Sequence, residues 1–319
     1  MPDNAAMHLL IPFASGADPG CAARLRALAL PRLTALLARL TAQPADAGDP
    51  RSLSPPHERA LAQARGLPLQ DGLLPWAALD AQAAGLTRPG DGLAWARVTL
   101  CHWEIGTHQV SQRPGPLPGL TEADSQALMA AAAPYFAGDG IDLHAFQPQH
   151  WLAQGPPLHR LPTASVDRVA GQEVHPWLPA GPGGALLRRL QTEMQMLFYN
   201  HPVNDARSAQ GLPTVNALWF SGSGELAAAA RPAPELRVID TLREPALAGD
   251  WEAWAHAWQA LDAGPLADLL ALAQGPRSVS LTLCGEHSAR SWVSAPRPIW
   301  QKVWNQIRPK APYSLIYQL

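Results

Sequence analysis

The clearest pattern in the sequence is an apolar stripe that begins near residue 186. Apolar residues there recur at spacings of three and four, the period of an amphipathic helix, and Pro202 ends the helix because proline cannot continue the hydrogen-bond ladder. Residues 214–220 are β-branched and aromatic, which predicts a strand that ends at Ser-Gly-Ser-Gly, residues 221–224. The segment therefore predicts a helix, a polar turn, a strand and a polar loop in succession. The stripe consists of Leu186, Leu190, Met194, Leu197 and His201.

Helical and strand patterns alternate along the rest of the chain, which favours an α/β fold. Residues 7–13 form the first predicted strand, and residues 93–105 alternate well enough to form a long one. Thr121 and Asp124 begin an Ala-rich helix to about residue 133 in the manner of a capping box. The other predicted helices cover residues 21–41 (interrupted at Pro31), 57–65, 74–84, 250–261 and 265–273, and the other predicted strands cover residues 236–239 and 278–284.

The spacing of tryptophans in the C-terminal third indicates how its helices pack. Trp251, Trp254 and Trp258 share one helix face, which indicates core packing, with a partner-binding face as the alternative. A last helix is predicted through residues 300–304, and residues 313–317 predict an edge strand. The aromatic residues of this part are therefore expected mainly in a core.

Turn-rich and Pro-rich stretches divide the chain. Residues 85–92 are rich in turn residues, and residues 227–234 are rich in Ala and Pro. We therefore expect an N-terminal α/β part (residues 1–92), a middle segment that carries the polar motifs (residues 93–226) and a C-terminal α/β part (residues 227–319). We expect the three parts to form one compact unit.

Composition narrows the class of protein. With 319 residues, of which 47% are hydrophobic and 16% charged, the chain is long and apolar enough to bury a large core. The net charge of −2 gives no field for nucleic acid or for an anionic membrane, so neither is an expected partner. The 3 cysteines lie far apart, which argues against a disulfide framework or a structural zinc site. The sequence shows no signal-peptide pattern or membrane span, so we expect a cytoplasmic protein.

Polar side chains without an evident structural task concentrate between residues 188 and 226. Glu193 falls on the edge of the apolar helix face, where a buried carboxylate needs a partner. His201 is either a cap or core residue or a ligand contact, and Asn204 is predicted to cap a short turn that carries Arg207. If the strand enters beside the helix end, these side chains line one cleft, where the Ser-Gly loop would cradle an anion. The candidate ligand-binding residues are Glu193, His201, Asn204, Arg207, Asn216, Trp219, Gly222 and Gly224.

The same segment resembles a known family. Residues 201–226 read HPVNDARSAQGLPTVNALWFSGSGEL. They resemble the His-Pro-Val-Asn, Arg, Gly and Asn-x-x-Trp-x-x-Gly-x-Gly motifs of the archaeal-type cofactor-independent phosphoglycerate mutases, members of the alkaline phosphatase superfamily. Residues 7–284 resemble more closely a group of bacterial proteins described as phosphoglycerate mutases or as regulatory proteins of the RpfE type. The resemblance implies an alkaline-phosphatase-like central sheet flanked by helices, reduced relative to the true mutases.

The departures from the family pattern concern its metal centre. The resemblance implies two divalent ions held by Asp and His residues, but the first strand runs into Ala14-Ser15-Gly16 where the family has Pro-Asp-Gly. Residues 280–292 resemble the family's later strand and Gly-Asp-His-Ser motif, with Glu286 and His287 in place of its Asp and His. Two hard cations need about six carboxylate or imidazole ligands, and the sequence supplies about two at matching positions.

Two functions are therefore compatible with the sequence. The first is a non-catalytic regulatory or ligand-binding protein, a mutase-like pseudoenzyme without cofactor, whose partner is a small phosphorylated or anionic metabolite or another protein. The second is a phosphoglycerate mutase, an isomerase, or a phosphoester hydrolase with rearranged ligands for Mn²⁺ or Mg²⁺ and with Arg207 as phosphate clamp. The catalytic candidates are Ser221, Ser223 and His287, and the metal-ligand candidates, which must lie within a few ångströms of one another, are His102, Glu104, Glu286 and His287.

Overall fold

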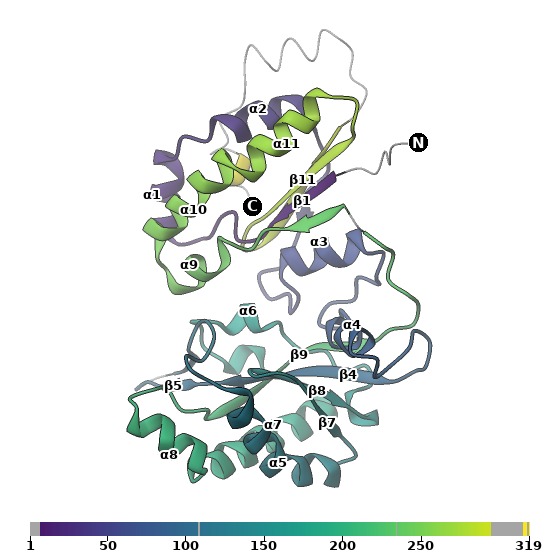
Figure 1. Ribbon diagram of the computed structural model, residues 1–319, viewed down its shortest axis with the longest axis vertical. Coiled ribbons are helices and arrows are strands. Elements are labelled where there is room, and N and C mark those ends of the chain that lie inside the picture. Colours follow the sequence, from purple (N-terminus) through teal and green to yellow (C-terminus); the bar gives the residue numbers. More distant parts are fainter. Residues whose placement is uncertain (1–6, 108, 234, 295–314, 318) are drawn as a thin grey trace. The chain divides into compact units, whose positions relative to one another are not determined.

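The chain divides into two compact units (Figure 1). The computed structural model describes residues 7–107, 109–233, 235–294, 315–317 and 319. Each unit contains a β-sheet with helices packed against it, so the predicted α/β class is confirmed. Unit 1 comprises Met1–Arg51, Pro55–Gly66 and Arg231–Leu319, and unit 2 comprises Ser52–Ser54 and Leu67–Ala230.

The sheet of unit 1 has the strand order β10-β1-β11-β12-β2, and β3 also pairs with β12. Strands β10, β1 and β11 are parallel, whereas β12 runs antiparallel to β11. The carboxyl ends of parallel strands meet at one edge of a sheet, and ligands of open α/β sheets usually bind at that edge. The strands are β1 (Met7–Ile11), β2 (Thr41–Ala42), β3 (Asp46–Ala47), β10 (Leu236–Val238), β11 (Val279–Cys284) and β12 (Ser288–Val293).

One face of this sheet is apolar because the strands alternate. In β11, Leu281 and Leu283 point to a core that contains Trp254 and Trp258 of α10, so the prediction that the tryptophan stripe packs in a core is confirmed. The break predicted at Pro31 is also confirmed, since this residue begins α2. The helices are α1 (Pro19–Ala27), α2 (Pro31–Arg39), α3 (Pro56–Ala64), α9 (Arg243–Ala248), α10 (Trp251–Ala263) and α11 (Pro265–Gln274).

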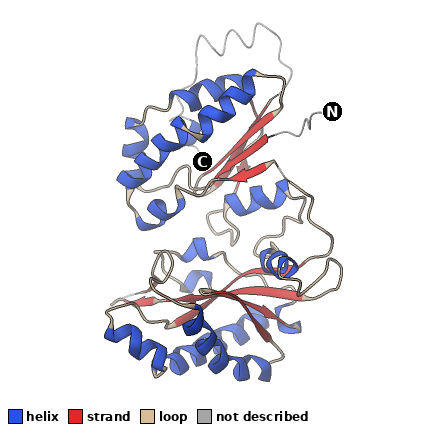
Figure 2. Cartoon of the chain, viewed as in Figure 1, coloured by secondary structure: helices blue, strands red, loops and turns tan. Residues whose placement is uncertain are grey.

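Unit 2 is built on an antiparallel sheet of strand order β7-β8-β4-β9, with a separate β5-β6 ribbon. Helices α5 and α7 cover one face, and α4 packs on β4 and β9 (Figure 2). The strands are β4 (Ala94–Cys101), β5 (Trp103–Ile105), β6 (Val110–Gln112), β7 (Asp142–Gln147), β8 (His150–Gln154) and β9 (Ala217–Glu225). The helices are α4 (Trp76–Ala83), α5 (Glu122–Gly138), α6 (Val166–Val169), α7 (Gly181–Tyr199) and α8 (Pro202–Ala209), with short 3₁₀ helices at Pro156–Leu158 and His175–Trp177.

The structure corrects two predictions around β9. The strand does not end at residue 221 but continues to Glu225, because a bulge absorbs the Gly-rich stretch: Gly222 has a φ of 60°, and the pairing with β4 shifts between Trp95 and Arg97. The N-cap of α8 is His201, whose Nδ1 accepts a hydrogen bond from the Val203 N–H, so the prediction that Asn204 is the cap was wrong.

Other predicted boundaries shift by a few residues. The strand predicted over residues 93–105 is divided at His102 into β4 and β5. The capping box of Thr121 and Asp124 is confirmed, and α5 continues past the predicted end, through Pro134. The predicted helix through residues 300–304 and residues 313–314 of the predicted edge strand lie outside the described residues. Residues 315–317 form a helical turn, so the prediction of a strand was wrong there.

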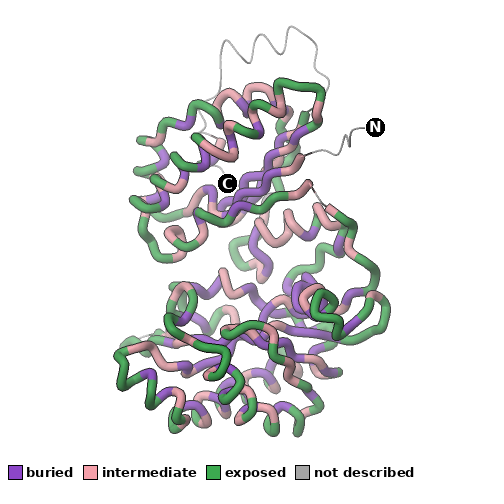
Figure 3. Tube along the Cα trace, viewed as in Figure 1, coloured by how far each residue is buried: buried purple, intermediate pink, exposed green. Residues whose placement is uncertain are grey.

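Buried positions follow the strands and the helix faces that pack on them (Figure 3). The largest fully buried side chains include Trp95, Trp151 and Trp219 in unit 2 and Trp254 and Trp258 in unit 1, so each unit has its own aromatic core. Within the described part of the chain, no helix has the length and apolarity that crossing a membrane would require.

Candidate functional site

Asn204 lies at the junction of α7 and β9, in the middle of the segment that stands out in the sequence. Its side chain is 4% exposed. The amide Nδ2 donates to the main-chain oxygens of Phe198 (2.8 Å) and Val215 (2.7 Å), and Oδ1 accepts from the Val215 N–H (2.8 Å). These bonds tie the last turn of α7 to the chain that enters β9, which is a structural task.

Arg207 and Asn216 lie at the same junction. The Arg207 Nε donates to the Pro213 carbonyl (2.8 Å) and Nη2 to the Pro118 carbonyl (3.0 Å), and burial lowers the pKa of this guanidinium. The Asn216 side chain accepts from the N–H of Trp103 (2.6 Å) and donates to its C=O (2.9 Å), as a paired strand residue would. The structure thus brings Asn204, Arg207 and Asn216 together at one junction. Their side chains form hydrogen bonds to main-chain groups.

The remaining predicted ligand-binding residues of unit 2 lie on separate surfaces or in the core. Glu193 pairs with Arg189 on α7 (2.8 Å), and the Trp219 Nε1–H donates to the Ala164 carbonyl (3.0 Å). Gly224 follows the bulge in β9. Ligand binding by these side chains stays a prediction.

The two serines proposed as nucleophiles lie in β9 rather than in a loop. Ser223 is fully buried, and its hydroxyl donates to the Leu161 carbonyl (2.6 Å). Ser221 is 5% exposed and lies opposite Arg97 in the ladder. Burial in a paired strand restricts the access of a substrate to either hydroxyl.

The four metal-ligand candidates are split between the units. His102 and Glu104 belong to unit 2, where the His102 Nδ1–H donates to the Thr214 carbonyl (2.8 Å). Glu286 and His287 belong to unit 1, where Oε1 of the carboxylate lies 3.8 Å from Nε2 of the imidazole. Among the residues that the structure describes, no three His, Cys, Asp or Glu side chains form a group that could hold a metal ion.

The carboxyl ends of β1 and β11 lie side by side in unit 1. The Ala14 N–H donates to the Cys284 carbonyl (2.7 Å), so the residues after the first strand adjoin the residues after β11. Phe13 occupies the left-handed region with a φ of 56°, and its carbonyl accepts from the Trp254 Nε1–H (2.9 Å). A bulky residue in this conformation is strained, and such strain concentrates at functional sites.

Main-chain donors at this edge are filled by oxygens of the chain itself. Oε2 of Glu286 accepts from the Ala17 N–H (2.7 Å), and Oδ1 of Asp18 accepts from the Gly20 N–H (2.6 Å) at the start of α1. Burial raises the pKa of the neighbouring Cys21 thiol to about 11, and Asp18 and Glu286 add to this effect. The thiol is therefore neutral near pH 7 and is not an activated nucleophile.

The loop that follows β11 binds a further acceptor oxygen. The main-chain oxygen of Leu319 accepts from the Ser288 N–H (2.8 Å), the Ser288 hydroxyl (3.0 Å) and the His287 N–H (3.3 Å). The His287 side chain is 41% exposed, so it remains accessible beside these donors. We call this arrangement the edge site; it consists of Ser15, Glu286, His287 and Ser288.

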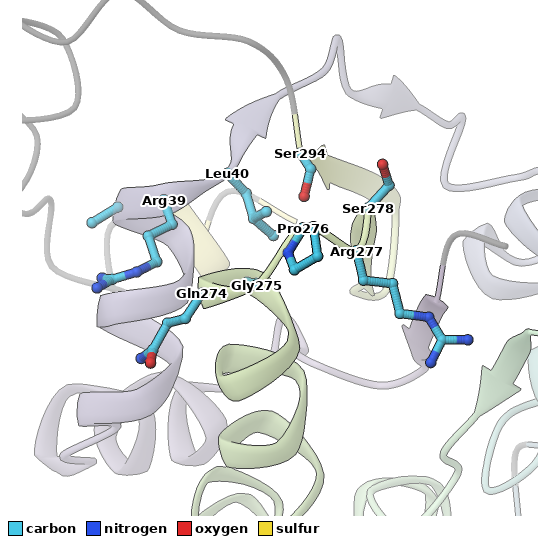
Figure 4. A pocket seen from close by; sticks show the side chains of 10 residues that line it. Arg39, Leu40, Gln274, Gly275, Pro276, Arg277, Ser278 and Ser294 are labelled. Atoms are coloured by element: carbon cyan, nitrogen blue, oxygen red, sulfur yellow. The ribbon is translucent and has the colours of Figure 1, made fainter. Parts of the chain in front are cut away.

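A groove of about 530 Å³ lies at the other end of β11, between the ends of α2 and α11 (Figure 4). The guanidinium groups of Arg39 and Arg277 point away from one another in it, and Arg277 pairs with Glu235 (3.1 Å). Since the groove adjoins the amino end of β11, it lies at the edge of the parallel strands opposite to the usual ligand edge. We therefore take the edge site as the candidate functional site.

Sequence reasoning found Glu286 and His287 but missed Ser288 and Leu319. The rule that ligands bind at the carboxyl ends of parallel strands would have pointed to the residues directly after β11. No local pattern predicts the contact of Leu319, because it joins parts of the chain 31 residues apart.

The fold and site define an α/β protein in which hydrogen-bond donors gather at the carboxyl ends of two parallel strands. The sequence matches no protein-family model and no curated protein. Among solved structures, a cofactor-independent phosphoglycerate mutase from Thermoplasma acidophilum is similar over 98% of each chain, with 11% identity and a TM-score of 0.35. The PH0037 protein from Pyrococcus horikoshii is similar over 91% of this chain and 88% of its own, with 10% identity and a TM-score of 0.43. At these values neither likeness carries an argument about function, and the resemblance to RpfE-type regulatory proteins stays a prediction.

Proposed function

We propose that this protein binds a small phosphorylated or carboxylated metabolite at the edge site and acts as a regulatory binding protein rather than as a catalyst. The observation that carries this proposal is the convergence of the Ser288 N–H, the Ser288 hydroxyl and the His287 N–H on one oxygen atom. Consecutive main-chain N–H groups with a hydroxyl are typical donors for phosphate and carboxylate oxygens. Their position at the carboxyl ends of β1 and β11 agrees with the usual ligand edge of α/β sheets.

The residues at the edge do not fit the two-ion centre that the mutase resemblance implies. Ser15 stands in the stretch where that family has its first Asp, and Glu286 is engaged with the Ala17 N–H. The edge thus offers Glu286 and His287 where two hard cations need about six ligands. A binding role requires none of the missing ligands.

A second candidate function is a phosphoglycerate mutase or phosphoester hydrolase with rearranged ligands for Mn²⁺ or Mg²⁺. It is favoured by the 3.8 Å approach of the Glu286 carboxylate to the His287 imidazole, since such pairs serve as metal ligands or as acid and base. In this case His287 would hold the metal or transfer a proton.

One experiment separates the two functions. EDTA-treated protein is titrated with phosphoglycerate by calorimetry, and mutase turnover is measured with and without added Mn²⁺ or Mg²⁺. We expect metal-independent binding that weakens by about tenfold in His287→Ala, because the exposed imidazole beside the main-chain donors is lost, whereas the main-chain N–H remains. The matched control His256→Ala changes an exposed histidine of α10 and should bind as the wild type does.

Two results would contradict the proposal. Metal-restored turnover that disappears in His287→Ala would assign the second function. If the protein did not bind phosphoglycerate either with or without metal, a small phosphorylated acid would be excluded as its ligand.

A further inference from the structure

Residues 315–317 and 319, the C-terminal segment that the structure describes, pack against the edge site. Ile316 is 0% exposed and Leu319 is 8% exposed, and both belong to the apolar core of unit 1. Their side chains anchor the segment, so that the main-chain oxygen of Leu319 reaches the donors of His287 and Ser288. The segment therefore combines an apolar anchor with an acceptor oxygen.

Gly285 allows this close packing because it has no side chain. A β-carbon at this position would lie 2.6 Å from the carbonyl carbon of Leu319 and would also collide with the hydroxyl of Ser15. A serine hydroxyl can rotate away, but the main chain of Leu319 would have to move. Gly285 is thus the residue on which the position of the segment depends.

We propose that Leu319, anchored by Ile316, occupies the edge site in cis and competes with its anionic ligand. This inference rests on the proposed function, because it concerns the same donors. Each donor of Ser288 and His287 that binds the Leu319 oxygen has to exchange it for a ligand oxygen. The apparent affinity for the ligand then equals the affinity of the open site multiplied by the fraction of molecules in which the segment is displaced.

The occupant also defines the class of ligand. The Leu319 oxygen is held by two N–H groups and one hydroxyl, a set that a phosphate or carboxylate oxygen satisfies equally well. The adjoining positions of Ile316 and Leu319 are apolar and buried. Displacement therefore opens a site for a small acid, with donors on one side and apolar surface on the other.

The test uses two variants that displace the segment in different ways. Gly285→Ala introduces the collision with Leu319, and a second variant lacks residues 315–319. The matched control is Gly275→Ala in unit 1, where the nearest atom, the Leu272 oxygen, would lie at an ordinary contact distance of 3.5 Å. Phosphoglycerate is titrated into the wild type and each variant by calorimetry, and amide hydrogen exchange is measured at His287 and Ser288.

The expected result is an affinity about tenfold higher in both displacing variants than in the wild type and in Gly275→Ala. Exchange at His287 and Ser288 should be faster in the ligand-free displacing variants, because their N–H groups lose the Leu319 oxygen. If Gly285→Ala fails to fold, the affinity of the variant that lacks residues 315–319 tests the competition alone.

The failure of this inference can be told apart from the failure of the proposed function. Equal or weaker binding in the displacing variants, with binding by the wild type, would overturn competition and leave the proposed function in place. Absence of phosphoglycerate binding by every variant would overturn both. Unchanged amide exchange at Ser288 would show that the segment does not cover the site and would also overturn the inference.

Discussion

The two units use the polar groups of their sequence motifs differently. In unit 2, the side chains of Asn204, Arg207 and Asn216 form hydrogen bonds to main-chain groups of the same unit. In unit 1, the main-chain N–H groups of Ala17 and Ser288 donate to a side-chain oxygen and to the main-chain oxygen of a distant residue. The side chains of the polar motif that stands out most in the sequence are therefore bonded to main chain of their own unit, whereas the less prominent motif carries the donors to which we assign the proposed ligand.

The largest expected effect tests the structural task of Asn204. Replacement by Ala leaves both main-chain groups of Val215 without the buried Asn204 amide and removes one donor from the Phe198 carbonyl, which still accepts from the His201 N–H. Each such loss costs on the order of 1 kcal/mol or more, so Asn204→Ala should lower the free energy of opening of β9 by about 3 kcal/mol. Native-state hydrogen exchange of the β9 amides measures this change.

The control for this prediction is Asn200→Ala, at the exposed end of α7, which should change the stability by less than about 0.5 kcal/mol. Phosphoglycerate binding should be unaffected by either variant. If Asn204→Ala abolished binding and left β9 as stable as before, Asn204 would be a ligand contact and the contrast between the units would disappear.

A smaller effect is expected at the bulge of β9. Gly222 has a φ of 60°, and a β-carbon there would lie 3.0 Å from the β-carbon of Trp76. Gly222→Ala therefore combines a left-handed conformation with a close contact, and we expect it to destabilise unit 2 by about 2 kcal/mol. Gly211→Ala, at a φ of 69° with open space around it, should cost about 1 kcal/mol, the conformational part alone.

Urea unfolding of both glycine variants measures the difference. Loss of phosphoglycerate binding in Gly222→Ala, without loss of stability, would support the anion-cradling loop that the sequence suggested for this stretch. Equal destabilisation in the two variants would show that the contact with Trp76 contributes nothing.

The sequence predicts those parts of the fold that local chemistry decides. Pro31 begins a helix because its missing N–H is not needed there, and Thr121 with Asp124 forms the expected capping box. The prediction for the end of β9 was wrong because the bulge lies in the pairing of β9 with β4, which is more than 100 residues earlier in the sequence.

The candidate site shows the same division. Residues 14–17 lie close to Glu286 because they follow two adjacent parallel strands, β1 and β11. The hydrogen bonds of Asn216 to Trp103 span 113 residues, so no local pattern could reveal that this side chain is already engaged. Spacing along the chain can indicate polar residues as site candidates. Only the structure shows which of these side chains already have long-range hydrogen-bond partners.

The smallest expected effect distinguishes the units by pH. Burial lowers the pKa of His8 in unit 1 from its ordinary value of 6.5, and its Nε2 lies 2.8 Å from the Thr282 hydroxyl. In unit 2, burial acts to raise the pKa of Asp71, but hydrogen bonds from the main chain of Leu53 and Ser54 and from the hydroxyls of Ser52 and Ser54 outweigh it and lower the pKa below 3.8. The two groups therefore titrate in separate pH windows.

The sign of both effects follows from proton binding. Between pH 6.5 and the lowered pKa of His8, the unfolded chain binds more protons than the folded one, so unit 1 loses stability as the pH falls through this window. The contribution of Asp71 to the stability of unit 2 is lost only below about pH 3.8.

Hydrogen exchange of the β11 and β4 amides at pH 7.5 and pH 5 measures the stability of the two units separately. His8→Gln, which keeps a polar group but does not titrate, should reduce the pH dependence of β11 and leave β4 unchanged, whereas the exposed control His256→Gln should change neither. An unaltered pH dependence of β11 in His8→Gln would show that another group controls the acid sensitivity of unit 1.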